Sequence, residues 1–265
     1  MKVKNYSIGT DIEMFFQDKK SGEIVSAEGF VPGTKHEPFV FDPNNKYFST
    51  SLDNVLAEFT VPPAQTKHDW LSSILKSMDY VQSLAEKANC VAVALPAAYL
   101  DKKYLRTKNA REFGCDADFN VWLKSQNPKP VPTKGLRSGG LHVHVGYEDS
   151  NLDVNEAVIK TLDLFLGVPS ILMEPDNDRK KLYGKAGTFR FKPYGVEYRT
   201  LSNHFISSRR LIEWVYEGTE NAIDFVNNND LDFLDTYADK IMGAINNNDK
   251  VAAQNLINEF NLVTA

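Results

Sequence analysis

Charged residues alternate with apolar residues in the stretch 187–203, GTFRFKPYGVEYRTLSN, more densely than a buried strand could hold without a function. Arg190 and Lys192 occupy alternate positions in its first half, and Glu197 and Arg199 do so in its second half. In a β-strand, alternate residues point to the same face of the sheet. The stretch therefore predicts strands with an apolar face that packs and a charged face that is available for chemistry.

Three stretches upstream repeat this alternation. They are 9–15 with Asp11 and Glu13, 56–61 with Glu58, and 139–146 with His142 and His144. Each polar residue stands next to strand-forming residues. Taken alone, the two acids of 9–15 would more often mark a solvated strand face. The later strands favour a different interpretation, in which all these side chains line the concave face of one sheet for catalysis.

Glu58 lies in an otherwise apolar run, between Ala57 and Phe59. An unpaired carboxylate there would cost several kcal/mol to bury. We therefore expect a metal ion or an arginine next to Glu58. We expect residues 51–61 to form one strand, and Asp53 near its entry is a weaker candidate for the same site.

The acids and histidines of these strands form an oxygen-rich set of potential metal ligands. The set consists of Asp11, Glu13, Glu58, Glu197, His142 and His144. Such a set suits Mg²⁺ or Mn²⁺ better than zinc or copper. If the strands converge, it would hold two or three ions.

Three cations, Arg190, Lys192 and Arg199, share the charged face with these acids. Metal ions combined with arginine and lysine are the usual equipment for transferring a phosphoryl group. A simple metallohydrolase would need the ions without the cations, and a sugar hydrolase would need two acids without the cations or histidines. The residue types therefore favour phosphoryl transfer.

The composition excludes several classes of protein. With 265 residues, 42% of them hydrophobic, the chain can bury a core. Its net charge of −5 and pI near 5.6 argue against nucleic-acid binding through phosphate contacts. Cys90 and Cys115 have no partners at zinc spacing, so we expect neither a disulfide scaffold nor a zinc site. The chain shows no secretory signal and no apolar run long enough to span a membrane, so we expect a soluble, cytoplasmic protein.

Strands and helices must position these residues. We expect strands at 3–17, 23–25 and 91–95, a helix at 66–89, and a helix that Asp153 caps and that ends at Gly167. Helices should fill 207–265, with breaks at 227–229 and 246–248. No repeat or linker forces a division, so we expect one domain over 1–265 with a helical part from about residue 205. The segment 99–138 lacks periodicity and is either a lid or an ordinary excursion.

Four of these motifs resemble those of a known family. GGLHVHVGY is similar to a strand of the glutamate–cysteine ligase-like carboxylate–amine ligases, and YGVEYRTLSN, GTDIEMFF and LAEFTVPP resemble three further motifs in that family's order. Together they cover about residues 8–203. The chain is most similar to the phage-type COOH–NH2 ligases (type 2) of the glutamine synthetase superfamily, which PGTK, FGCD and KPYGVEYR also resemble. Asp11 departs from the pattern, because the family has a glutamate there.

The resemblance implies an α+β fold, in which an antiparallel half-barrel backed by helices binds ATP and two or three Mg²⁺ or Mn²⁺ ions on its concave face. It also implies an ADP-forming ligase. ATP would convert a carboxylate into an acyl phosphate, and an amine would then displace phosphate to form an amide. If the protein is phage-encoded, it would act in the host cytoplasm.

Roles carry over from the resemblance by position. The metal ligands would be Asp11, Glu13, Glu58, His142 and Glu197. His144 and Arg199 would contact the ATP phosphates, and Arg190 or Lys192 would lie near the phosphates or the acyl phosphate, which makes the two arginines and Lys192 the catalytic cations. Lys35, in the Pro/Gly loop 31–38, and the segment 116–120 would contact nucleotide or substrate.

Two alternatives stay open. A phosphotransferase related to the guanidino kinases would share the charged face and release a phosphorylated product. A non-catalytic relative would bind metal, nucleotide or a partner without turnover. The sequence leaves open whether the substrates are amino acids, peptides, cell-wall fragments or a protein terminus, and it leaves the oligomeric state open.

Overall fold

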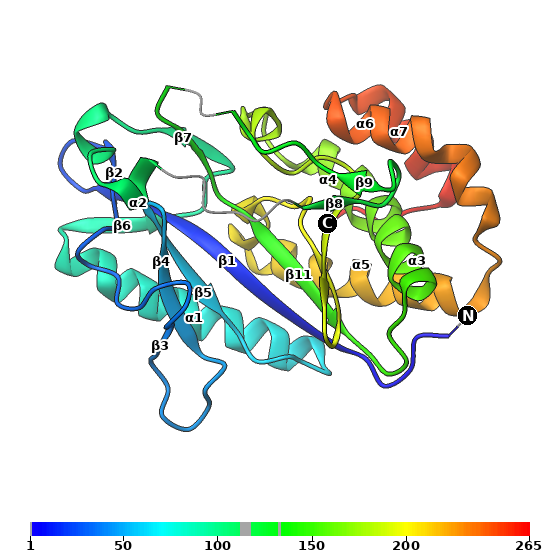
Figure 1. The fold of residues 1–265 in the computed structure, drawn as a ribbon, viewed down its shortest axis with the longest axis horizontal. Coiled ribbons are helices and arrows are strands. Elements are labelled where there is room, and N and C mark those ends of the chain that lie inside the picture. Colours follow the sequence, from blue (N-terminus) through cyan, green and yellow to red (C-terminus); the bar gives the residue numbers. More distant parts are fainter. Residues whose placement is uncertain (1, 112–117, 132–133) are drawn as a thin grey trace.

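A large antiparallel sheet with helices packed against it forms the centre of the computed structural model (Figure 1), which describes residues 2–111, 118–131 and 134–265. The main strands, in order across the sheet, are β3 (Phe39–Val40), β4 (Ser49–Asp53), β5 (Leu56–Thr60), β1 (Ser7–Asp18), β11 (Leu141–Gly146), β13 (Gly195–Tyr198), β12 (Thr188–Lys192), β8 (Phe119–Asn120) and β9 (Ser125–Gln126). β2 (Ile24–Val25) and β6 (Cys90–Val93) pair with the end of β1, as the predicted hairpin and buried strand require. A separate pair consists of β7 (Ala97–Tyr99) and β10 (Leu136–Ser138). The predicted antiparallel sheet backed by helices is confirmed.

The helices follow the chain order around this sheet. They are α1 (Lys67–Lys87), α2 (Lys108–Arg111), α3 (Leu152–Leu162), α4 (Val168–Met173), α5 (Arg209–Asn228), α6 (Ala238–Asn246) and α7 (Lys250–Phe260). Both predicted Asn-rich breaks in the C-terminal part are confirmed, since α5 ends at Asn228 and α6 at Asn246. In the described ranges, no helix is both long and apolar enough to cross a membrane.

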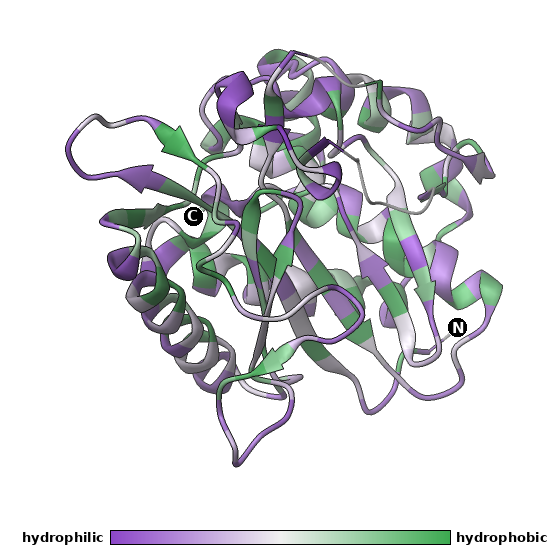
Figure 2. Cartoon of the chain, turned by 60° about the vertical axis from the view of Figure 1, so that its left-hand side comes forward, coloured by the Kyte–Doolittle hydropathy of each residue, from purple (hydrophilic) through white to green (hydrophobic). Residues whose placement is uncertain are grey.

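Apolar and polar residues follow one another along the strands, which Figure 2 shows as green and purple bands. Because alternate residues of a strand point to opposite faces, this pattern gives the sheet an apolar face and a polar face. On β1, the side chains of Ile8, Ile12 and Met14 are buried in the main core. Trp70 and Ile74 of α1 belong to the same core. Burial of these apolar side chains is what holds β1 against α1, since each is worth about 1.5–3 kcal/mol when removed from water.

Helix α1 begins and ends as its sequence predicts. The Thr66 side chain accepts a hydrogen bond from the Asp69 amide at 3.1 Å, which caps the N-terminus. Asn89 takes a left-handed conformation after the last turn, with φ of 55°. The predicted helix over 66–89 is confirmed.

The prediction of one strand over 51–61 is wrong. The chain turns at Asn54, whose φ of 61° is left-handed, and β4 and β5 form a hairpin in which Ser51 lies opposite Glu58. Asparagine tolerates this conformation better than most residues, so the Asp53–Asn54 pair is a turn signal that outweighs the apolar pattern around it. The turn brings Asp53 back toward Glu58.

The helix predicted from Asp153 to Gly167 also differs in detail. Its N-terminal cap is Asn151, whose side chain accepts from the Val154 amide at 3.1 Å, and not Asp153. A π-helical turn, Asp163–Gly167, then joins α3 to α4. Gly167 is required there, because an added Cβ would lie 2.7 Å from the Tyr198 hydroxyl.

Of the segment 99–138, residues 112–117 and 132–133, including Cys115, lie outside the described residues. The rest contains short elements, among them α2, β8 and β9. The lid interpretation stays a prediction.

A buried carboxylate, Asp163, lies beneath the sheet at the π-helical turn. It accepts hydrogen bonds from the Tyr198 hydroxyl at 2.8 Å and from Trp122 Nε1 at 2.6 Å. Burial raises the pKa of Asp163 to about 6, although both donors act in the opposite direction. Asp163 thereby links β13, the β8–β9 region and the end of α3.

This raised pKa predicts a pH-dependent contribution to stability. The carboxyl group of the unfolded chain titrates near pH 4, so between about pH 4 and pH 6 only the folded state keeps the proton. As the pH rises through this range, the free energy of unfolding should therefore fall by on the order of 3 kcal/mol. Asp163→Asn cannot titrate, so its stability curve should lack this fall. Urea unfolding of both proteins from pH 4 to 7 measures the difference, with the exposed Asp235→Asn as the control. Parallel curves for Asp163→Asn and the wild type would contradict the assignment.

Candidate functional site

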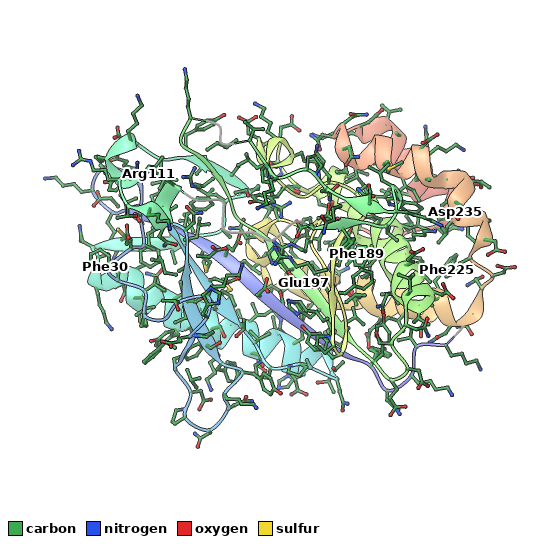
Figure 3. All side chains as sticks on the ribbon, viewed as in Figure 1. Phe30, Arg111, Phe189, Glu197, Phe225 and Asp235 are labelled. Atoms are coloured by element: carbon green, nitrogen blue, oxygen red, sulfur yellow. The ribbon has the colours of Figure 1, made fainter. Side chains whose placement is uncertain are left out.

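The polar residues of the sheet lie in rows across the strands, because the strand registers bring them opposite one another. The opposed pairs are Asp11 and His142, Glu13 and Glu58, His144 and Glu197, and Arg190 and Glu197. Side chains opposite one another on one face are close enough to interact. Figure 3 shows Glu197 near the middle of the molecule. The structure thus brings together residues that lie far apart in the sequence.

The first cluster of potential metal ligands consists of Asp11, His142 and Glu197, whose ligand atoms all lie within 4.8 Å of one another. The Asp11 carboxylate contacts His142 Nδ1, and its other oxygen lies 3.0 Å from His144 Nε2. Glu197 Oε1 lies 3.7 Å from His142 Nδ1. Two carboxylates and an imidazole make a donor set that fits Mn²⁺ or Mg²⁺.

Charge in this first cluster is balanced by neighbouring cations. Burial alone would raise the pKa of Asp11, but His142 and His144 hold it well below its usual range. Burial would likewise raise the pKa of Glu197, but Arg199 and the histidines lower it to about 2. Burial and Arg199 lower the pKa of His142, which favours the neutral imidazole that a metal requires.

The second cluster consists of three carboxylates, Glu13, Asp53 and Glu58, again with ligand atoms within 4.8 Å of one another. Glu13 accepts a hydrogen bond from the Gly140 amide at 2.7 Å, and Glu58 accepts one from the Ser51 hydroxyl at 3.0 Å. Sequence reasoning treated Asp53 only as a weak candidate. The turn at Asn54 was the signal that would have found it.

Like charges crowd this second cluster. Burial and the neighbouring carboxylates Asp11, Asp53 and Glu13 raise the pKa of Glu58 well above its usual range. Burial and Asp53 raise the pKa of Glu13 to about 8, against the Gly140 amide and two arginines. A divalent cation would relieve this repulsion, so the residues fit a bound metal ion.

Three cations surround Glu197. Lys192 Nζ lies 2.6 Å from Glu197 Oε2, Arg190 Nη1 lies 3.6 Å from Oε1, and Arg199 Nη1 contacts Oε1 directly. Arg199 Nη1 also lies 3.2 Å from His142 Nδ1. The cations predicted as catalytic therefore border the first metal cluster.

Lys35 lies at the edge of the same site. It lines a cavity of about 240 Å³ together with both metal clusters, Arg190 and Lys192. Gly33, two residues before Lys35, has a φ of 85°, and an added Cβ there would lie 2.6 Å from the Thr50 carbonyl oxygen. The Pro-Gly turn thus packs against β4 and brings the loop to the cavity.

Tyr194, in the turn between β12 and β13, escaped sequence analysis. Its hydroxyl lies 2.5 Å from His144 Nδ1. Tyr194 also lines a mainly apolar cavity of about 350 Å³ with Tyr47, Val61 and Pro63, which meets the metal cavity at Thr60. Residues in turns follow no periodic pattern. The one available signal for Tyr194 was an aromatic residue in a turn between two strands.

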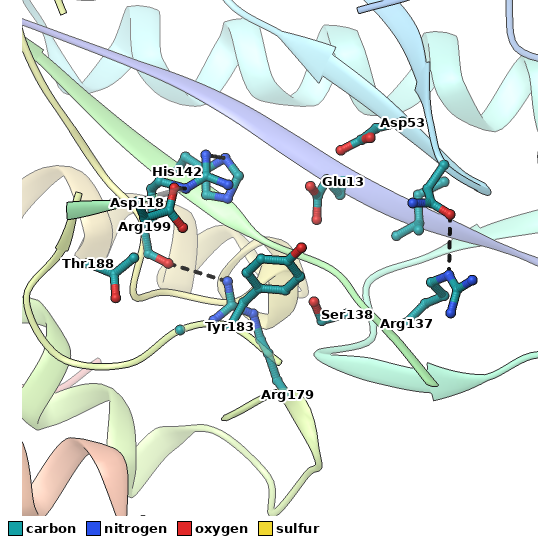
Figure 4. A pocket seen from close by; sticks show the side chains of 13 residues that line it. Glu13, Asp53, Asp118, Arg137, Ser138, His142, Arg179, Tyr183, Thr188 and Arg199 are labelled. Atoms are coloured by element: carbon teal, nitrogen blue, oxygen red, sulfur yellow. Dashed lines mark hydrogen bonds and ion pairs between the residues drawn. The ribbon is translucent and has the colours of Figure 1, made fainter. Parts of the chain in front are cut away.

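Buried arginines on the other side of the metal clusters were also missed. Figure 4 shows Arg137, Arg179 and Tyr183 around a third cavity, the arginine-lined cavity. It shares Glu13 and Arg199 with the cavity of about 240 Å³ that both acidic clusters line. Arg179 donates hydrogen bonds to the carbonyls of Gly139 at 3.2 Å and Thr200 at 2.9 Å. The basic run at 179–181 was the available signal, but a run of charge is usually solvated.

The predicted contact segment 116–120 divides into three parts. Asp116 and Ala117 lie outside the described residues. Asp118 lies in the site, where its Oδ1 is 2.9 Å from Arg190 Nε. Asn120 has a structural position, since its amide donates to the Ala186 carbonyl at 3.0 Å and its oxygen accepts from two backbone amides.

The crowding of the second cluster predicts how metal and mutation change stability. Saturating Mn²⁺, at 100 times its Kd, should raise the melting temperature of the wild type by about 5–10 °C. Glu58→Gln removes one ligand, so the rise should shrink to less than half. Without metal at pH 7 the variant should be more stable than the wild type, because the raised folded pKa of Glu58 costs the wild type stability as the pH rises above the pKa of the unfolded carboxyl group.

Differential scanning calorimetry with and without Mn²⁺ measures both effects. The matched control is Glu86→Gln on the exposed face of α1, whose side chain accepts a hydrogen bond from Gln82. An equal Mn²⁺ response in Glu58→Gln and the wild type, or a metal-free variant that is less stable than the wild type, would count against a metal cluster here.

No curated protein sequence matches the chain. Among solved structures, the chain is similar to Plasmodium falciparum glutamine synthetase, with 10% identity and a TM-score of 0.38 over 83% of this chain and 52% of that one, so it spans about half of that protein's length. It is also similar to a structure described as a novel glutamine synthase homolog, with 10% identity and a TM-score of 0.39 over 98% of this chain and 68% of the other.

A family model gives the more specific result. Residues 128–217 match the family described as phage phiEco32-like COOH.NH2 ligase-type 2. This segment contains both histidines of β11 and the charged residues of β12 and β13. The match supports the resemblance for the two motifs that it contains, GGLHVHVGY and YGVEYRTLSN, and over residues 128–217 this chain is similar to the phage phiEco32-like COOH.NH2 ligases of type 2.

Proposed function

We propose that this protein is an ATP-dependent carboxylate–amine ligase that works through an acyl phosphate and releases ADP and phosphate. The observation that carries the proposal is the position of two acid-rich clusters beside three cations on one face of the sheet. The match of residues 128–217 to a ligase family supports it. We also propose that the sheet curves into a half-barrel with the site on its concave face.

Mg²⁺ or Mn²⁺ would be held at both clusters. Asp11, His142 and Glu197 would form one site, and the carboxylates of β1, β4 and β5 would form the other. The raised pKa values of Glu13 and Glu58 support this, because a divalent cation would relieve the repulsion between the crowded carboxylates and keep them ionised. When bound, the ions would neutralise charge on the phosphate oxygens and orient the phosphoryl group for transfer.

ATP would lie across the boundary between two cavities. The apolar cavity beside Tyr47, Pro63 and Tyr194 suits a planar base, and it meets the metal cavity, which suits the phosphates. His144 lies between them, in contact with both Tyr194 and Asp11. In this arrangement His144 and Lys35 would contact the phosphate chain.

Arg190, Lys192 and Arg199 would stabilise the reacting groups. Acyl phosphate formation brings an anionic carboxylate to an anionic phosphoryl group, so fixed positive charge lowers the barrier. Arg199 is buried, with 5% of its surface exposed, and charge acts more strongly where water is excluded. Exclusion of water would also protect the acyl phosphate until the amine attacks its carbonyl carbon and phosphate leaves.

The two substrates would enter on the side of the arginine-lined cavity. This cavity adjoins the metal cavity through Glu13, Asp53, His142 and Arg199. Its mixture of buried acids and arginines suits small molecules or peptides with carboxylate and amino groups, or a protein terminus.

The test is ADP and phosphate release from ATP with Mg²⁺ or Mn²⁺, measured across a panel of acids and amines with mass spectrometry of the products. A product lighter by one water than its two parents is expected. A phosphorylated small molecule would indicate a phosphotransferase instead. Metal and nucleotide binding without turnover across a wide panel would favour a non-catalytic binding protein.

Two substitutions test the assigned residues. Glu197→Gln and Arg199→Ala should each lower turnover by about two to three orders of magnitude, the usual scale for losing one positioned electrostatic group. Matched controls come from an ion pair outside the site, Arg209 with Glu213, whose Nε and Oε1 atoms are 3.0 Å apart. Arg209→Ala and Glu213→Gln should leave turnover unchanged. Near wild-type turnover in folded Glu197→Gln or Arg199→Ala would refute the assignment.

A further inference from the structure

The strand register places Asp118 at the end of the row of charged side chains that runs across β13 and β12. β8 pairs with β12 so that Asn120 lies opposite Thr188 and Phe119 opposite Phe189. One step further along this register, Asp118 lies opposite Arg190. Its side chain therefore enters the same face of the sheet as Glu197 and Arg199.

One oxygen of Asp118 contacts two of the proposed catalytic cations. Asp118 Oδ1 lies 2.9 Å from Arg190 Nε and 3.2 Å from Arg199 Nε. The carboxylate is almost fully buried, with 7% of the residue exposed. The ion pairs are therefore shielded from water. Ion pairs are stronger when water is excluded, so these contacts fix the side-chain geometry strongly.

The two guanidinium groups would otherwise repel each other. Arg190 and Arg199 come from neighbouring strands, and both also approach Glu197 Oε1 through Nη1. Each arginine is thus held by two carboxylates, with Asp118 at Nε and Glu197 at Nη1. Two fixed points on a planar group determine its orientation, whereas one leaves it free to rotate.

We propose that Asp118 is a positioning residue, which orients the guanidinium groups of Arg190 and Arg199 toward the transferring phosphoryl group. This inference rests on the proposed function. Glu197 alone would not suffice, because the same function assigns Glu197 to a metal ion. Asp118 belongs to neither group of potential metal ligands found among the described residues, so its carboxylate stays available to the arginines.

The backbone around Asp118 is fixed well enough for this role. The Asn127 amide donates to the Asp118 carbonyl at 2.7 Å. The ring of the next residue, Phe119, packs on Phe189 and Phe191 with centroids 6.1 and 5.1 Å apart. β8 is thereby anchored to β12, and the Asp118 carboxylate with it.

Measurements of kcat, of the KM of the amine substrate and of the melting temperature in two variants distinguish a positioning role from other roles of Asp118. Asp118→Asn removes the charge but keeps an oxygen of the same size beside both Nε atoms, while Asp118→Ala removes the charge and the oxygen. If Asp118 orients the arginines, kcat should fall about tenfold to a hundredfold in Asp118→Ala and clearly less in Asp118→Asn, the scale for residues that orient an active-site group. The KM of the amine substrate should change by less than about threefold in both. Both substitutions should lower the melting temperature, because they remove a buried partner of two arginines, so kcat is compared at temperatures at which every variant is folded.

The control is Asp235, whose carboxylate pairs with Lys160 at 2.5 Å outside the site. Asp235→Ala and Asp235→Asn should leave kcat unchanged. Equal loss of kcat in Asp118→Asn and Asp118→Ala would mean that only the charge matters, and would overturn the positioning role. A main effect on the KM of the amine would overturn it too, because Asp118 would then contact that substrate.

A structural measurement separates this inference from the proposed function. In crystal structures of Asp118→Ala and the wild type, both guanidinium groups should change orientation, and this comparison needs no turnover. If both stay in place, Asp118 does not position them, whatever the enzyme does. If the wild type catalyses no ligation but the arginines move, the proposed function fails and the structural role of Asp118 stands.

Discussion

The register between β1 and β11 is the constraint on which the rest of the site depends. It sets Asp11 opposite His142, and a slip of one residue would turn every polar side chain of one strand toward the core. The apolar residues on the other face prevent such a slip, since Ile8, Ile12 and Val143 are fully buried. The same alternation that forms the core therefore also assembles the polar face, and stability and site geometry have one cause.

The electrostatics of the site change along the sheet. Around Glu197, cations lower the pKa of the carboxyl group, whereas around Glu58, neighbouring acids and burial raise it. Cations are thus concentrated around Glu197, and crowded acids around Glu58. In the proposed function, the phosphates of a metal-bound polyphosphate would lie toward the cations, and its metal ions would lie at the carboxylates.

Sequence reasoning predicted the site residues of the central strands β1, β5, β11, β12 and β13 and missed several that loops and turns bring to the site. Asp11, Glu58, His142 and Glu197 alternate with apolar neighbours, and period-two alternation is a signal that needs no knowledge of the fold. Asp53 has little signal of its own, because the apolar pattern around it predicts one continuous strand and conceals the turn at Asn54. Arg179 and Tyr194 were missed because long-range packing, and no local pattern, brings loop residues to a site.

Strand β1 links the two clusters of potential metal ligands, since Asp11 belongs to one and Glu13 to the other. Alternate residues of a strand lie about 6–7 Å apart along its axis, and a strand paired on both sides has little freedom to stretch or bend. In the proposed function, the spacing of the two clusters would therefore come from sheet geometry and not from loops. The two histidines of β11 contact Asp11 and hold its carboxylate in place, so the geometry of the first cluster also depends on the register between β1 and β11.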